Sequence, residues 1–344
     1  MSEHVDVVVI GAGISGIAAG YYLQQRCPRK SYLVLEGRAD LGGTWDLFRY
    51  PGIRSDSDMY TLGYAFKPWT AGKAIADAED IMAYLREAAT ENGIDSHIRF
   101  QHRVTRAEWS SDNNRWALSV EQGATGEAIQ VTCNFLLGCS GYYNYEAGYT
   151  PEFAGTDSFK GRIVHPQNWT DDIDYAGKMV VIIGSGATAV TLVPALAGKA
   201  EHVTMLQRSP TYVVARPATD PFVTRLRRGL PEAWVYSLVR WKNVLQNMFL
   251  FWYARTFPQR AKAMIIRGVS DAVGPGVDVD RHFTPTYNPW DQRVCLVPDA
   301  DLFVSIRNGQ ASVVTDHIER FTERGILLKS GDTLQADLVV TATG

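Results

Sequence analysis

Two stretches of the chain share one pattern, in which a short apolar run ends in a glycine-rich turn and continues into small and apolar residues. The first run is residues 5–10 (VDVVVI), with the turn at 11–16 (GAGISG), and the second is residues 179–183 (MVVII), with the turn at 184–189 (GSGATA). Short runs of β-branched residues bounded by glycine predict strands, and the residues that follow suit a helix. The chain therefore repeats a strand–turn–helix unit.

Other elements follow from the same patterns. Period-two and short apolar runs predict strands at 31–35, 116–120, 135–139, 202–206, 313–315, 325–328 and 336–340, and wider apolar spacing predicts helices at 81–89 and 190–196. Residues from about 217 to 280 are helical, aromatic and basic without strand alternation, and we interpret them as an insertion. We predict an α/β fold of two Rossmann-like, three-layer (β/β/α) dinucleotide-binding domains, residues 1–145 and 146–344, with the helical insertion in the second.

The most apolar part of the insertion is residues 234–253, which are rich in Trp, Phe, Leu and Val. Arg240, Lys242 and several amides interrupt it, and this excludes a membrane-spanning helix. An amphipathic helix is the prediction. Packing inside the protein or at a subunit interface is the favoured interpretation, and weak contact with a membrane surface stays open.

Bulk composition narrows the function class. A length of 344 residues suggests two domains, and 46% hydrophobic with 21% charged residues is ordinary for a globular protein. A net charge of -3 without a long basic block makes nucleic acid an unfavourable partner. The four cysteines show no CxxC spacing, which favours a reducing cytoplasm, and the histidines form no ligand cluster, so no metal is predicted.

The first glycine turn has the spacing GxGxxG, with Gly11, Gly13 and Gly16 at the fixed positions. In such turns the glycines permit the tight bend, the approach of backbone N–H groups to a pyrophosphate, and close packing of helix on strand. The next predicted strand ends in Glu36, 25 residues beyond Gly11, where a carboxylate accepts hydrogen bonds from a ribose and repels a 2'-phosphate.

The second turn carries Gly184 and Gly186, and Ala189 replaces the third glycine. Its following strand ends in Gln207 and Arg208, and a guanidinium at Arg208 can clamp a 2'-phosphate. One turn thus repels the 2'-phosphate that the other attracts. We therefore predict FAD in the first domain and NADPH in the second.

Two longer motifs add a family resemblance. Residues 43–56 (GTWDLFRYPGIRSD) resemble the Baeyer-Villiger signature GxWxxxxYPGxxxD at every fixed position, and residues 159–169 (FKGRIVHPQNW) resemble the fingerprint FxGxxxHxxxW of the same flavin monooxygenases. Amine- and sulfide-oxidising relatives usually carry Tyr or Phe where Trp169 stands. The chain thus resembles a Baeyer-Villiger-type flavin monooxygenase.

The resemblance implies a set of site residues. Beyond the glycines, the implied FAD contacts are Ser15, Glu36, Thr44, Trp45, Asp46, Leu47, Asp56 and the backbone of Val104. The implied NADP contacts are Arg54, Ser55, Asp56, Ile183, Gly184, Ser185, Gly186, Ala187, Thr188, Ala189, Gln207 and Arg208. The implied catalytic group is Arg293, with Asp56 as its partner, and His165 is a further candidate whose position in the fingerprint suits a hinge.

The resemblance also implies the reaction. A C4a-peroxyflavin formed from FAD, NADPH and molecular oxygen inserts one oxygen atom into ketones, giving esters or lactones, or oxidises sulfur in thioethers or thioamides. Arg293 is expected to stabilise the developing negative charge. The substrate is a small molecule, and a homo-oligomer stays open.

Two alternatives remain at this point. An NADPH-dependent flavoprotein reductase would share the two dinucleotide folds, although it would leave residues 43–56 unexplained and would need a redox cysteine pair. In the family the chain completes its FAD domain after a motif like Ala342-Thr343-Gly344, so the resemblance implies a chain truncated at its C-terminus. A cofactor-binding fragment without oxygenase activity is therefore the second alternative.

Overall fold

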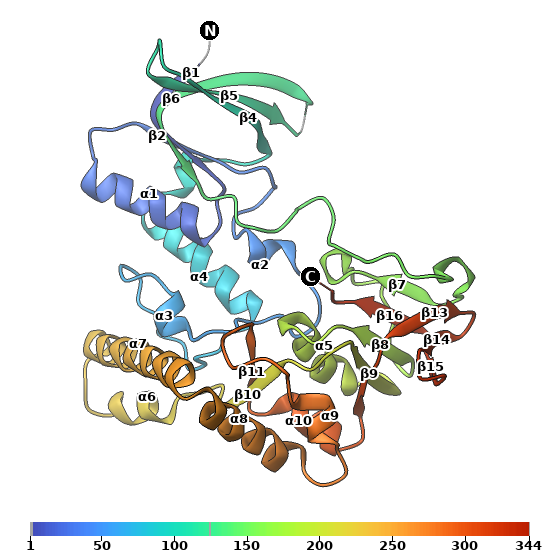
Figure 1. The fold of residues 1–344 in the computed structure, drawn as a ribbon. Coiled ribbons are helices and arrows are strands. Elements are labelled where there is room, and N and C mark those ends of the chain that lie inside the picture. Colours follow the sequence, from blue (N-terminus) through green and yellow to red (C-terminus); the bar gives the residue numbers. More distant parts are fainter. Residues whose placement is uncertain (1–2, 124, 344) are drawn as a thin grey trace. The chain divides into compact units, whose positions relative to one another are not determined.

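The computed structural model describes residues 3–123 and 125–343 and divides into two compact units (Figure 1). The first unit comprises Met1–Phe48 and Ala78–Tyr145, and the second comprises Arg49–Asp77 and Glu146–Gly344. Both units are therefore discontinuous in sequence, because residues 49–77 group with the second. The outermost ends of the two expected domains, at Met1 and Gly344, lie outside the described residues.

The first unit contains one sheet and three α-helices among its described residues. Its elements are β1 (Glu3–Ile10), α1 (Ile14–Arg26), β2 (Tyr32–Leu35), α2 (Thr44–Leu47), α4 (Ala78–Glu91), η1 (Asp95–His97), β3 (Ile98–Arg99), β4 (His102–Ser110), β5 (Arg115–Gln122) and β6 (Glu127–Gly138).

The sheet of the first unit has the order β3-β2-β1-β6-β5-β4, in which β3, β2, β1 and β6 run parallel while β5 and β4 continue as an antiparallel ribbon. The residues of β2 are all buried, as expected for a parallel strand covered on both faces. Helices α1 and α4 contact each other beside the sheet (Figure 1). One core cluster joins parallel strands to the ribbon, and it contains Val8, Leu33, Leu35, Leu118, Val120, Val131 and Cys133. Helices, parallel strands and ribbon form three layers.

The second unit contains the remaining elements. They are α3 (Met59–Leu62), η2 (Thr156–Ser158), β7 (Arg162–Val164), η3 (Pro166–Asn168), β8 (Met179–Ile183), α5 (Ala187–Ala197), β9 (His202–Gln207), β10 (Tyr212–Arg216), α6 (Pro221–Leu226), α7 (Glu232–Thr256), α8 (Pro258–Val273), α9 (Val279–Phe283), β11 (Val294–Pro298), α10 (Asp301–Arg307), β12 (Ala311–Thr315), β13 (Ile318–Thr322), β14 (Gly325–Leu328), β15 (Thr333–Gln335) and β16 (Leu338–Thr341).

Its main sheet is parallel throughout, with the order β12-β9-β8-β16-β7. Helices α5 and α10 contact each other and the main sheet. Residues of the antiparallel sheet β13-β14-β15 pack against residues of the main sheet in one core cluster. That cluster contains Phe159, Val181, Ile183, Leu206, Phe321, Ile326, Leu328, Ala336 and Val339. The second unit thus repeats the three layers of the first, and the predicted α/β class is confirmed.

Helices α6 to α9 form the insertion, which lies between the paired parallel strands β10 and β11 (Figure 1). The longest of them, α7, buries Val235, Tyr236 and Val239 against its own unit. The predicted packing of this helix inside the protein therefore holds for one of its faces, and the other face is described below.

Candidate functional site

The first glycine turn lies between β1 and α1 and cannot carry side chains at two of its glycines. Gly11 has φ +100°, and a Cβ there would lie 2.5 Å from the carbonyl oxygen of Cys139. A Cβ on Gly16 would lie 1.9 Å from the carbonyl oxygen of Gly11. Gly13 precedes α1 and supplies no side-chain cap, so the first amides of the helix keep their capacity to bind an anion.

Glu36 follows β2 directly and is 6% exposed. Its carboxylate accepts hydrogen bonds from the backbone N–H of Ala12 at 2.7 Å and of Arg38 at 2.9 Å. A carboxylate has about four lone-pair directions, so acceptor positions remain for ribose hydroxyls. The arrangement fits the adenosine side of a dinucleotide that lacks a 2'-phosphate.

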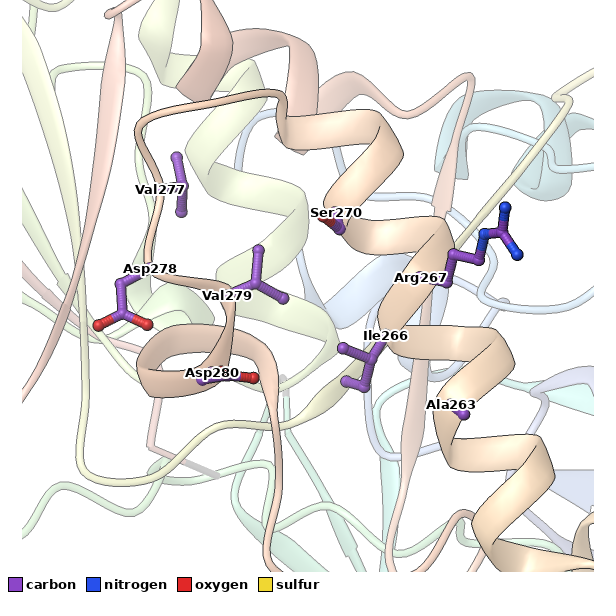
Figure 2. Close-up of a pocket in the computed structure, with 8 residues that line it drawn as sticks. All are labelled: Ala263, Ile266, Arg267, Ser270, Val277, Asp278, Val279 and Asp280. Carbon is purple, nitrogen blue, oxygen red and sulfur yellow. The ribbon is translucent and has the colours of Figure 1, made fainter.

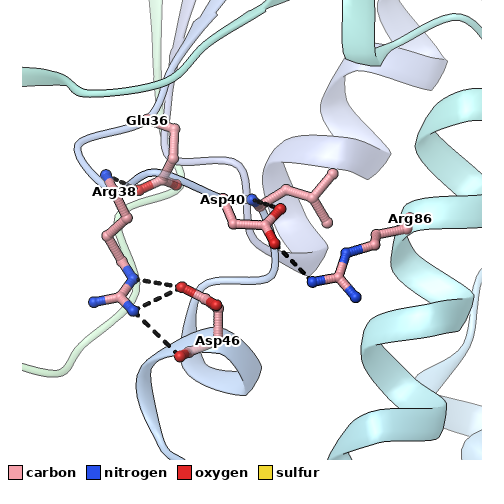
Figure 3. Close-up of polar contacts among 6 residues, drawn as sticks. Glu36, Arg38, Asp40, Asp46 and Arg86 are labelled. Atoms are coloured by element: carbon pink, nitrogen blue, oxygen red, sulfur yellow. Dashed lines mark hydrogen bonds and ion pairs between the residues drawn. The ribbon is translucent and has the colours of Figure 1, made fainter.

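Arg38 connects Glu36 to the start of the long signature (Figure 3). Its guanidinium donates to the Asp46 carboxylate from Nε at 2.9 Å and from Nη2 at 2.6 Å, and it lies 5.8 Å from the centre of the Tyr145 ring. Arg86 of α4 forms an ion pair with Asp40 at 2.6 Å nearby. Sequence reasoning missed Arg38 and Tyr145, and the only signal for Arg38 was its position two residues after Glu36.

The signature residues of the first unit lie against the glycine turn. The N–H of Gly42 donates to the carbonyl oxygen of Ala12 at 3.0 Å, and a Cβ on Gly13 would be 3.5 Å from the Cα of Gly43. The short helix α2 follows, so it begins beside this turn. Of the other predicted FAD contacts, Asp46 and Leu47 are buried, Thr44, Trp45 and Val104 are partly buried, and Ser15 is exposed on the first turn of α1.

The second glycine turn lies between β8 and α5. Gly184 has φ +139°, and a Cβ there would lie 2.2 Å from the carbonyl oxygen of Ala342, just after β16. Gly186 differs, because nothing lies within 4 Å of a Cβ built on it. It precedes α5 without a side-chain cap, while Ala189 is fully buried where the third glycine is expected. The open space at Gly186 fits a ligand that approaches the backbone.

The residues after β9 lie beside this turn. The hydroxyl of Ser185 lies 2.9 Å from that of Thr211 and 3.4 Å from the carbonyl oxygen of Ser209. Arg208 is exposed, as a residue that binds a phosphate from solution has to be. These features fit a nucleotide with a 2'-phosphate.

Gln207 is oriented differently from Arg208. It is 2% exposed, and its side-chain amide donates to the carbonyl oxygen of His282 at 2.7 Å and to Thr315 Oγ1 at 2.9 Å. The side chain therefore joins β9 to α9 and β12. A contact between Gln207 and a nucleotide would have to come from its backbone.

The second half of the long signature packs on α5. Gly52 has φ +76°, and a Cβ there would lie 2.7 Å from the Cβ of Ala195. Burial raises the pKa of Tyr50, and a hydrogen bond with Thr188 partly opposes this shift. Residues 49–56 of the signature therefore share one unit with the second glycine turn.

Arg54 and Ser55 have structural contacts of their own. Arg54 pairs with Asp301 at the start of α10, with 2.5 Å between Nη1 and Oδ2, and sequence reasoning missed this partner. Ser55 is buried, and its hydroxyl accepts a hydrogen bond from the Ala76 N–H at 3.1 Å. Both contacts fix the backbone that leads to Asp56.

Arg293 and Asp56 meet although 236 residues separate them in the chain. The closest nitrogen and oxygen atoms are 3.9 Å apart, and both side chains are 58% exposed. Such an exposed pair contributes little to stability, and it leaves the guanidinium accessible to a small molecule. The predicted catalytic pair is thus brought together at the surface of the second unit.

The loop that carries Arg293 is attached to helix α7. Asp291 pairs with Arg255 at 2.5 Å, and Trp290, which has φ +69°, packs edge-on against the Phe251 ring. Two residues after Arg293, burial raises the pKa of Cys295 to about 11, so this thiol stays protonated. The loop therefore lies between the insertion and β11.

His165 follows β7, at the opposite edge of the main sheet from β12. Its Nδ1 accepts a hydrogen bond from the Gln167 N–H at 3.2 Å, and a Cβ on Gly148 would lie 1.9 Å from its ring. Burial lowers the pKa of His165, which favours the neutral ring with its proton on Nε2. No contact with Arg293 or Asp56 is found in the described part of the chain. Sequence reasoning missed the close approach of Gly148.

A hollow of about 600 Å³ lies elsewhere in the second unit, between α8 and the segment that leads into α9 (Figure 2). In Figure 2 the Arg267 side chain points away from that segment. Asp278, on the rim, caps α9 by accepting from the Arg281 N–H at 3.0 Å. None of the predicted site residues lines this hollow. Within residues 3–123 and 125–343, no group of three His, Cys, Asp or Glu side chains is arranged to hold a metal ion.

Comparisons with known proteins agree with this geometry. A family model described as flavin-binding monooxygenase-like matches residues 73–252, and one described as an NAD(P)-binding Rossmann-like domain matches residues 9–84. The FAD-containing monooxygenase EthA of Mycobacterium tuberculosis is 56% identical over 345 residues, covering all of this chain and 70% of the relative. The probable FAD-binding monooxygenase AlmA of Acinetobacter baylyi is 48% identical, covering all of this chain and 69% of the relative.

Solved structures give the same result. A steroid monooxygenase bound to NADP matches 99% of this chain and 71% of its own, with a TM-score of 0.80 and 26% identity. The enzyme OTEMO in complex with FAD and NADP matches all of this chain with a TM-score of 0.79 and 24% identity, which supports the fold alone.

Proposed function

This chain belongs to the FAD-containing, flavin-binding monooxygenase family, and from that membership we propose that it uses FAD and NADPH to insert one oxygen atom from O2 into a small organic substrate. The proposed substrates are ketones, which would give esters or lactones, and sulfur in thioethers or thioamides. The observation that carries the proposal is the pair Arg293–Asp56 at 3.9 Å, on a unit that also holds the second glycine turn.

We assign FAD to the first unit and NADPH to the second. The first glycine turn and the Glu36 carboxylate would bind the pyrophosphate and adenosine ribose of FAD, with Arg38 keeping the buried Asp46 carboxylate neutralised. The second turn would bind the pyrophosphate of NADPH, and Arg208 its 2'-phosphate. When bound, NADPH supplies hydride and FAD supplies electrons to oxygen.

Arg293 would act on the substrate. Its guanidinium can donate hydrogen bonds to the carbonyl oxygen, on which negative charge develops as oxygen is transferred. Asp56 would hold the guanidinium in position, because its carboxylate is the charged group that the structure brings beside it. An exposed pair reorients at small cost, so the arginine can change partner when a substrate arrives.

We propose a positioning role for His165 in place of proton transfer. Its Nδ1 is occupied by the Gln167 N–H, and burial favours its neutral form, so it can donate one hydrogen bond from Nε2. We further propose a cytoplasmic location, supported by four free cysteines.

The test supplies ¹⁸O2 and NADPH to the FAD-loaded protein with a methyl ketone or an aryl methyl thioether, and the product is analysed by mass spectrometry. We expect one ¹⁸O atom in the ester or sulfoxide. Arg293→Ala should lower ester formation by about 100-fold or more, the loss typical of one group that stabilises an oxyanion. Arg320→Ala, at an exposed arginine of β13, is the matched control and should change nothing.

Two results would contradict the proposal. NADPH consumption that yields only hydrogen peroxide or reduced dye would indicate a flavoprotein reductase. Failure to retain FAD at all would indicate a fragment without oxygenase activity.

A further inference from the structure

Helix α7 carries a second apolar stripe on the side that faces away from its own unit. The stripe consists of Trp234, Leu238, Trp241, Leu245, Met248 and Trp252, each 45% to 67% exposed. The spacing of these residues alternates between four and three, so they lie on one face of a helix. Six large apolar side chains in one row exceed the scattered exposure that is normal for a protein surface.

The opposite, inner face of α7 already packs against the second unit. The exposed stripe is therefore not a core-facing surface left open by a misplaced helix. Arg240 donates to the carbonyl oxygen of Tyr60 at 2.7 Å and to that of Gly63 at 3.1 Å. Asn243 donates to the Asp58 carboxylate at 2.8 Å. A helix that is apolar on two faces requires a partner for each, and α7 has one for its inner face.

The surrounding charge indicates which partner fits the outer stripe. Residues 221–267 contain nine Lys or Arg and one acidic residue, in a chain whose net charge is -3. Three of these cations pair with Glu232, Asp220 and Asp291. Helices α6 and α8 contact α7, and four more cations are exposed on these two helices or in the turn that follows α6: Arg225, Arg228, Arg260 and Arg267. Exposed arginines therefore lie on the segments that flank the apolar stripe, and we call these four arginines the basic rim.

From this combination we propose that α7 docks on an anionic membrane surface. Tryptophan and leucine on one face with arginine beside them is the composition of helices that lie in the headgroup region. A second copy of the chain would bring one basic rim against another, which is unfavourable. No helix of the described residues is long and apolar enough to cross a membrane, so the proposed contact is interfacial. The proposal does not depend on the reaction that the protein catalyses.

The experiment measures co-sedimentation with vesicles of phosphatidylcholine alone and of phosphatidylcholine with about one third phosphatidylglycerol. We expect binding to the anionic vesicles, with a blue shift of tryptophan fluorescence and weakening as salt is raised. The double variant Trp241→Ser/Trp252→Ser should lower the partition coefficient by at least about tenfold. The double variant Arg225→Gln/Arg228→Gln should lower it by roughly fivefold for each charge lost.

Two matched controls accompany these variants. Trp109→Ser removes an exposed tryptophan from β4 of the first unit, and Arg320→Gln removes an exposed arginine from β13. Neither should change vesicle binding. Unchanged unfolding temperatures for all variants would show that the stripe and rim variants stay folded.

Three outcomes would overturn the proposal. The first is equal partition onto neutral and anionic vesicles, or none onto either. The second is a dimer in light scattering that the tryptophan variants dissociate, which would identify a second copy as the occupant. The third is protection of the outer stripe from hydroxyl-radical labelling in a monomer without vesicles, which would mean that another part of the protein covers it.

Discussion

Replacing each glycine of the second turn by alanine should separate folding from nucleotide binding. At Gly184 the backbone has φ +139°, which costs an L-residue about 1–3 kcal/mol, and the new methyl group would stand 2.2 Å from the Ala342 carbonyl oxygen. At Gly186 the backbone has φ -82°, and nothing lies within 4 Å of the new methyl group. Both substitutions add one methyl group, but only the one at Gly184 produces a steric clash.

The expected sizes follow from these environments. Gly184→Ala should cost at least about 3 kcal/mol and lower the unfolding temperature of the second unit by roughly 6–12 °C. Gly186→Ala should lower it by only about 2–4 °C, because replacing a glycine N-cap by alanine costs roughly 1 kcal/mol and no steric clash is added. Its methyl group would, however, stand where backbone N–H groups approach a pyrophosphate. The loss of one hydrogen bond to a charged group, about 1.5–3 kcal/mol, would weaken NADPH binding by about 10- to 150-fold.

Thermal unfolding in the absence of nucleotide measures the effect on stability, and a fluorescence titration with NADPH measures the effect on binding. Gly198→Ala, at the end of the same helix with nothing within 4 Å of the added carbon, is the control and should alter neither. Wild-type affinity for NADPH in Gly186→Ala would refute the assignment of this turn to the nucleotide. A large loss of stability in the same variant would refute the structural reasoning.

Two further predictions concern charge. Arg208→Gln should raise the dissociation constant of NADPH by about tenfold or more and change that of NADH by less than about twofold, as binding titrations with both nucleotides would measure. An equal loss of affinity for both nucleotides would argue against a 2'-phosphate contact. Burial lowers the pKa of His165 in the folded state, so the unfolded chain binds more protons below a pH of about 6.5, and the free energy of unfolding should fall as pH drops from about 7 toward 5. Urea unfolding at both ends of this range should show a smaller decrease in the free energy of unfolding for His165→Gln than for the wild type. Part of the decrease should remain, because burial also lowers the pKa of His282. A decrease equal to that of the wild type would contradict the lowered pKa of His165.

Local patterns were sufficient to predict much of the fold. Residues 179–183 were predicted as a strand and form β8 with the same bounds, because a β-branched run stopped by glycine has few other conformations. The two glycine turns and the residues that end the following strands are also local features. The sequence pattern identifies them, although the turns pack against distant residues, Cys139 beside Gly11 and Ala342 beside Gly184.

Features that depend on tertiary contacts were not predictable in this way. Nothing in the sequence around Gly52 indicates that it packs against Ala195, yet this contact helps to group residues 49–77 with the second unit. The pairing of Arg38 with Asp46 likewise joins side chains on separate elements. Helix periodicity predicted that α7 is amphipathic, but periodicity alone does not reveal that two of its faces are apolar.

The attachment of the Arg293 loop to α7 has a thermodynamic consequence. The ion pair between Asp291 and Arg255 and the packing of Trp290 on Phe251 give the loop and the helix shared contacts. Suppose that binding of a partner to α7 changes the affinity of the loop for its substrate by some factor. Substrate binding to the loop must then change the affinity of α7 for that partner by the same factor, because coupling between two binding equilibria is reciprocal. Saturating substrate would therefore serve as a probe of what α7 binds, without any change to the helix itself.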